Sequence, residues 1–121
     1  MDQHTPIDYR LLVDNLTTAI LLIDSNFNIF YLNSACEALF DISLLRASGQ
    51  PVLNLLHAPD DTFNTHEALL NTLKTGQPYT RREAIINVNF KDLHVDYTVS
   101  QLNAGKSYHP LLLIEIGRAS C

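Results

Sequence analysis

Hydrophobic residues near the N-terminus recur at helical spacing. One stripe, at i, i+3, i+4 and i+7, consists of Tyr9, Leu12, Val13 and Leu16. Ile7 and Leu11 form a second, adjacent stripe. The spacing predicts an amphipathic helix over about residues 6–16. Such a helix can dock one stripe on its own domain and present the other to a partner, or it can pack both stripes against its own core. The sequence does not decide between these two alternatives. The candidate dimer-interface residues are Ile7, Leu11, Leu12 and Leu16.

A short strand pair and a helix follow. Ala19 to Ile23 is an uninterrupted aliphatic run of strand length, residues 25–28 have turn composition, and residues 29–33 continue as a second strand. Ser34 and Glu37 have the spacing of a capping box, which predicts a short helix beginning at Ser34.

The middle of the chain predicts several helical turns. Ser43 and Pro51 suit helix starts, and Gly49 suits a helix end. A longer helix is expected over residues 61–74, with one apolar side. That side comprises Phe63, His66, Leu69, Leu70 and Leu73.

Three strands close the chain. The first two alternate between apolar and polar residues, which indicates a hairpin with one solvated face. Their apolar positions are Ala84, Ile86, Val88 and Phe90, then Leu93, Val95, Tyr97 and Val99. A loop over residues 102–109 precedes a final aliphatic strand, residues 111–116.

Composition narrows the functional classes. With 121 residues, 46% of them hydrophobic and 17% charged, the chain is expected to form one globular domain. The formal charge of -5 and the lack of a basic cluster disfavour direct binding to nucleic acid. No apolar run reaches the roughly 20 residues of a membrane-spanning helix. We therefore expect a cytoplasmic protein that does not contact the membrane.

The order of elements, with helices between the second and third of five strands, resembles the PAS domain, a sensory and dimerisation module. The likeness rests on Tyr31-Leu32-Asn33 running into Ala35-Cys36-Glu37-Ala38-Leu39-Phe40, and on Gly49-Gln50-Pro51 downstream. It implies an α+β PAS fold over residues 1–121: an N-terminal helix at about 6–16, then a sensor core at about 17–117 containing a five-stranded antiparallel sheet.

Residues 12–24 together with Gly76-Gln77 are similar to the N-terminal sensor domain of the nitrogen-regulation sensor histidine kinases, NtrB. The resemblance implies that the chain is the N-terminal fragment of a longer, homodimeric kinase. In that family, later domains bind ATP and Mg²⁺, phosphorylate their own histidine and pass the phosphoryl group to a response regulator, and a PII signal protein reverses the output. The sequence itself predicts no catalytic residue, metal site or cofactor in these 121 residues.

The sequence does not decide whether the core encloses a ligand pocket, because aliphatic side chains can pack solidly or enclose a space. The candidate lining residues are Ile20, Leu22, Leu39, Leu55, Leu70 and Val95. Arg81 and Arg82 point to opposite faces of a strand, so at most one can reach the interior and bind an anion there. Cys36 is interpreted as a small core residue, and His66 as a structural histidine.

Overall fold

One five-stranded antiparallel sheet organises the protein. The computed structural model describes residues 18–56, 62–102 and 110–118. In sequence order the strands are β1 (Ala19–Ile23), β2 (Ile29–Leu32), β3 (Tyr79–Val88), β4 (Lys91–Leu102) and β5 (Leu111–Arg118). In the sheet they lie in the order β2-β1-β5-β4-β3, so the first and last strands are neighbours at its centre.

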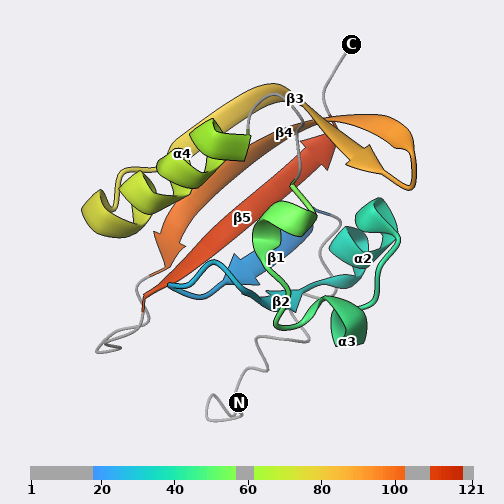
Figure 1. Ribbon diagram of the computed structural model, residues 1–121, viewed down its shortest axis with the longest axis horizontal. Helices are drawn as coiled ribbons and strands as arrows, with labels where there is room; N and C mark the ends of the chain where they lie inside the picture. Colours follow the sequence, from blue (N-terminus) through green and yellow to red (C-terminus); the bar gives the residue numbers. More distant parts are fainter. Residues whose placement is uncertain (1–17, 57–61, 103–109, 119–121) are drawn as a thin grey trace, which may run out of the picture.

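Four helical segments connect β2 to β3, and Figure 1 shows them in front of the sheet. They are α2 (Ser34–Phe40), α3 (Leu44–Ala47), the 3-10 helix η1 (Val52–Asn54) and α4 (Thr62–Thr75). The α+β class, the five antiparallel strands and the position of the short helices confirm the predictions. The predicted N-terminal helix and the loop tip at residues 103–109 lie outside the described residues.

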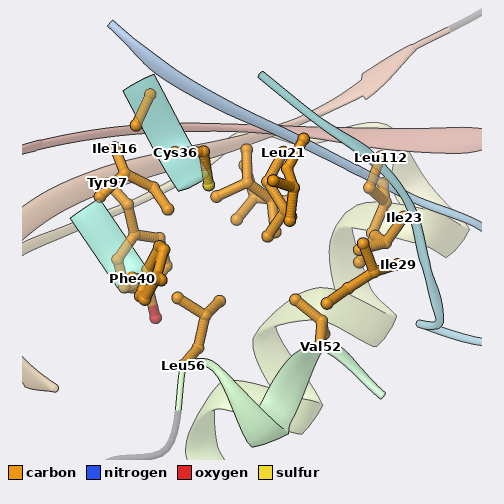
Figure 2. Close-up of a cluster of buried hydrophobic side chains, with 14 of the residues drawn as sticks. Leu21, Ile23, Ile29, Cys36, Phe40, Val52, Leu56, Tyr97, Leu112 and Ile116 are labelled. Carbon is orange, nitrogen blue, oxygen red and sulfur yellow. The ribbon is translucent and has the colours of Figure 1, made fainter. Parts of the chain in front are cut away.

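The hydrophobic core lies between the sheet and these helices. Strand alternation directs Leu21 and Ile23 of β1 and Ile116 of β5 inward, where each is at most 1% exposed. Figure 2 shows side chains of the strands pointing toward Phe40 of α2, Val52 of η1 and Leu56. We call this core-facing side of the sheet the inner face, and the opposite side the outer face.

The start of α2 differs from the predicted capping box. Asn33, not Ser34, is the N-cap: its side-chain Oδ1 accepts a hydrogen bond from the Cys36 backbone N–H at 3.0 Å. The Glu37 carboxylate does not return to its own helix start. Its Oε2 accepts a hydrogen bond from the Leu44 N–H at 2.6 Å, and so joins α2 to α3.

The β3–β4 hairpin is longer than predicted and its turn is placed differently. Strand β3 begins at Tyr79, and a bulge between Arg81 and Ala84 lets both side chains point inward. The prediction that Phe90 continues the buried alternation is wrong. Val88 pairs with Lys91, so Phe90 lies in a two-residue turn and is 98% exposed.

Candidate functional site

The six predicted pocket residues are divided between the two sides of the sheet. Val95 is fully buried in the core, and Leu39, Leu55 and Leu70 pack partly buried against it. The strand period of two places Ile20 and Leu22 on the outer face, because their neighbours Leu21 and Ile23 point inward. The six residues therefore cannot line a single pocket.

Two of the four inward residues line separate surface hollows. Leu39 borders a hollow of about 390 Å³ beside the end of β5. Leu55 borders another, of about 420 Å³, next to α3 and the start of β2. Neither hollow contains Leu70 or Val95.

A buried polar group does face the core under α4. Arg81 of β3 and Tyr97 of β4 are direct cross-strand partners, so their side chains lie on the same face. The Tyr97 side chain is hydrogen-bonded to Thr65 of α4 and to Arg81, and its ring meets Tyr79 edge to face with centroids 6.2 Å apart. Arg81 is half-buried and Arg82 is exposed, which is compatible with the expectation that at most one of the two arginines reaches the interior.

The electrostatics of this group follow from its burial. Tyr97 is 3% exposed, and burial raises the pKa of its hydroxyl above the ordinary value, although the Thr65 hydrogen bond and the Arg81 charge lower it. Two turns along α4 from Thr65, the Thr72 hydroxyl is fully buried without a hydrogen-bond partner. The inner face under α4 therefore carries polar side chains at positions where apolar side chains could also pack.

The outer face carries an apolar stripe over β2, β1 and β5. Register places Leu22 between Tyr31 on one side and Leu113 on the other, and pairs Leu111 with Leu102. We call these residues the outer-face stripe: Ile20, Leu22, Tyr31, Leu102, Leu111 and Leu113. The outer positions of β4 beyond the stripe are Asp96, Thr98 and Ser100, which is the polar composition expected of a solvated face.

Sequence reasoning missed Tyr31, Leu111 and Leu113 as interface candidates. The available signal was the uninterrupted aliphatic run of each central strand. A strand with one wet face alternates, whereas one that is apolar at consecutive positions is covered on both faces. The four predicted interface residues, Ile7, Leu11, Leu12 and Leu16, lie outside the described residues.

Other kinds of site find no support in the described part of the chain. Residues 18–56, 62–102 and 110–118 contain no group of three or more metal-ligating side chains. Cys36 is fully buried, and burial, then the charge of Glu37, raises the pKa of its thiol to about 12. His66 is exposed and its ring meets Phe27 edge to face, with centroids 5.3 Å apart.

Over the same described ranges, every helix falls short of the length and apolar character needed to cross a bilayer.

Comparison with known proteins agrees with this architecture. The family model described as the PAS fold matches residues 7–108. The chain belongs to the PAS family. No curated protein sequence matches it significantly.

Solved structures of other PAS domains align over nearly the whole chain. The PAS domain of nitrogen regulation protein NR(II) from Vibrio parahaemolyticus is 27% identical, with a TM-score of 0.73 over 93% of this chain and 99% of that one. A PAS domain from Colwellia psychrerythraea is 22% identical, with a TM-score of 0.72 over 88% and 91%.

A PAS domain from a two-component sensor histidine kinase is 13% identical, with a TM-score of 0.69 over 91% and 92%. Because this domain and the Colwellia domain are so low in sequence identity to the chain, their likeness shows the shared fold alone. The chain is thus a PAS sensory domain whose structural neighbours include domains of sensor kinases.

Proposed function

We propose that this PAS domain is the dimerisation and sensory module of a cytoplasmic nitrogen-regulation histidine kinase. Two copies meet through the outer-face stripe and the predicted helix at residues 6–16. Downstream domains bind ATP and Mg²⁺, phosphorylate a histidine and serve a response regulator and a PII signal protein. The likeness to the Vibrio NR(II) domain supports this placement among PAS proteins.

The outer-face stripe is the observation that carries the dimerisation proposal. Leu22 and Leu113 form a direct cross-strand pair on the side of the sheet opposite the core, and both are only partly buried. Removing such side chains from water contributes about 25 cal/mol per Å² of apolar area. A second copy is a self-complementary way to cover the same surface on both subunits.

The size of the stripe explains why the N-terminal segment belongs to the interface. A stable interface buries about 800 Å² per partner, from about 20 to 30 residues a side. The six side chains of the stripe fall short of that, and one of them, Ile20, is only 5% exposed and has little area left to bury. The helix predicted at about residues 6–16 precedes β1 in the sequence and has a second apolar stripe, so we propose that it adds to the interface area.

Sedimentation equilibrium tests the dimer. The wild-type chain is expected to sediment as a dimer, and Leu113→Asp or Leu11→Asp as a monomer, because each buries an unpaired charge at the interface. Asn71→Asp adds the same charge on the exposed side of α4 and is the matched control. A wild type that stays monomeric at high concentration contradicts the proposal.

Kinase context is tested separately on the full-length protein. Incorporation of the γ-phosphate of ATP into a histidine, in the presence of Mg²⁺, is the expected result. If the full-length protein dimerises yet incorporates no phosphate, the dimerisation proposal survives and the kinase assignment fails.

A second candidate function, a small-molecule sensor, is favoured by the polar group under α4. Arg81, Tyr97 and Thr65 supply donors on the core side of the sheet, where a ligand with acceptor oxygens would be recognised. Such a ligand would act by its different affinity for two conformations. Native mass spectrometry of the purified protein decides: an added mass that Arg81→Ala removes supports a sensor, and the bare chain mass opposes it.

A further inference from the structure

The bulge in β3 decides which of two consecutive arginines faces the core. Arg81 is the last residue of β3 that pairs before the bulge, opposite Tyr97. Pairing resumes at Ala84, so the two residues between them stand opposite the single residue Asp96 of β4. Because side chains alternate along a strand, the extra residue lets Arg81 face inward and leaves Arg82 on the other side. Their burial agrees, since Arg81 is half-buried and Arg82 is exposed.

A regular strand without the bulge would exchange the two arginines. Continuing the pairing of residues 84–88 with no extra residue places Arg82 opposite Tyr97 and turns Arg81 to the outer face. The same shift of one residue turns Tyr79 outward and ends its ring contact with Tyr97. The bulge therefore selects both neighbours of the Tyr97 side chain on β3.

The bulge strains the backbone at one position. Glu83 lies within it and has a φ of 55°, in the left-handed region. Glycine is the usual residue of this region in a bulge, because it has no Cβ. The Glu83 side chain is exposed, so its burial does not offset the strain. The stabilisation of the bulge therefore has to come from a neighbouring group.

Asp96 supplies this stabilisation from the outer face. Its Oδ1 accepts a hydrogen bond from the Glu83 backbone N–H at 2.7 Å, a length typical of bonds to a charged carboxylate. The neighbours of Asp96 along β4, Val95 and Tyr97, are buried in the core, so the Asp96 side chain lies on the opposite side of the sheet. One hydrogen bond on the outer face thereby supports the direction of Arg81 on the inner face.

We propose that Asp96 is the positioning residue for Arg81. Its hydrogen bond to the bulge directs the Arg81 guanidinium, rather than that of Arg82, to Tyr97 under α4. Because the two arginines are consecutive, a shift of one residue is enough to exchange them. The part of this proposal that concerns ligand recognition rests on the second candidate function, the small-molecule sensor, in which Arg81 supplies donors to a ligand.

Thiol labelling shows which side chain faces inward. Arg81→Cys and Arg82→Cys, each in a Cys121→Ser chain, place one reporter thiol on either side of the strand, and Cys36 is fully buried. Position 82 is expected to react at least about tenfold faster than position 81, because thiol reactivity follows exposure. Adding Asp96→Ala is expected to slow position 82 and to speed position 81, each by at least about threefold.

The change at position 82 separates positioning from a loss of stability. A substitution that only destabilises the fold can expose the thiol at position 81, but it cannot protect the thiol at position 82. Asp96→Asn is the matched control: its Oδ1 can still accept the Glu83 N–H, so the wild-type labelling rates are expected. Unchanged rates in the Asp96→Ala chain, or faster labelling at both positions, overturn the proposal.

A second variant decides the question if Asp96→Ala alone does not fold. Glycine adopts a positive φ without steric cost, so Glu83→Gly is expected to keep the bulge without the hydrogen bond to Asp96. The chain with both Asp96→Ala and Glu83→Gly is therefore expected to fold, with position 82 labelled faster than position 81. A double variant that does not fold, or that reacts faster at position 81, overturns the proposal.

Native mass spectrometry connects the bulge to ligand recognition. If Asp96 acts through Arg81, then Arg81→Ala lowers ligand occupancy in the wild-type chain but changes it by less than about twofold in the Asp96→Ala chain. An equal loss in both chains counts against the proposal. A wild-type chain that carries no added mass refutes the small-molecule sensor, while thiol labelling still decides whether Asp96 positions Arg81.

Discussion

Replacing Asn33 by alanine is expected to be among the most destabilising single changes in the domain. Asn33 is fully buried, and its Oδ1 accepts hydrogen bonds from the backbone N–H groups of Ile20, at 2.9 Å, and Cys36, at 3.0 Å. Its Nδ2 donates to the Thr18 carbonyl at 2.9 Å. One side chain therefore joins the start of β1 to the start of α2.

The magnitude follows from the groups left without partners. Loss of an N-cap costs about 1 kcal/mol. Each buried backbone group that loses its partner costs about 1 to 3 kcal/mol, and Ile20 N–H is such a group. Thr18 is exposed, so its carbonyl can bind water instead, and the cap and the Ile20 N–H together give an expected loss of about 2 to 4 kcal/mol, a large part of the 5 to 15 kcal/mol of a typical domain.

Urea unfolding of Asn33→Ala and Ser34→Ala provides the assay and its control. The sequence favours Ser34 as the cap, whereas the structure assigns the cap to Asn33 and leaves Ser34 exposed. Ser34→Ala is expected to change the unfolding free energy by less than about 0.5 kcal/mol. A loss below about 1 kcal/mol for Asn33→Ala, or equal losses for both variants, would refute the reasoning.

Three further predictions concern the buried side chains of Thr72 and Cys36. Thr72→Val is expected to stabilise the domain by up to about 1 kcal/mol in urea unfolding, because the buried Thr72 hydroxyl has no partner to lose; a clear loss would reveal a missed hydrogen bond. The Cys36 thiol, with a pKa of about 12, stays protonated at pH 8, so a Cys121→Ser chain should react with a thiol reagent only as fast as it unfolds. Rapid labelling of the native chain would contradict the burial. Because the pKa of the thiol in the folded chain exceeds the reference value of 9.0, the contribution of this thiol to the free energy of unfolding should fall as pH rises from 9 toward 12.

Local patterns predicted the elements well where one interaction dominates. Strand β4 alternates because one face meets the core and the other is polar, and Val95, Tyr97 and Val99 are buried as expected. The rotation of α4 was less predictable. Thr65 and Thr72 are buried beside Leu69, while His66 is exposed, because packing against β3, β4 and β5 decides which side of a mixed helix faces inward.

The candidate site was harder to predict because it depends on contacts distant in sequence. Asn33 and Ser34 are both good capping residues, and only the meeting of Asn33 with β1 decides between them. The inward direction of Leu21 fixed the outward direction of Leu22, but a continuous aliphatic run does not indicate which positions face the core. The exposure of Phe90 depended on a turn position that alternation alone places inside a strand.

Cysteine cross-linking across the outer face tests the central claim, that two copies meet there, most directly. Glu115 is exposed on β5, opposite Ile20 of β1 and Thr98 of β4, and Glu67 is exposed on α4 on the other side of the sheet. In a Cys121→Ser background, Glu115→Cys is expected to give covalent dimers with a short bifunctional reagent, and Glu67→Cys to remain monomeric. Dimers formed through Glu67→Cys, or none through Glu115→Cys, would contradict the account.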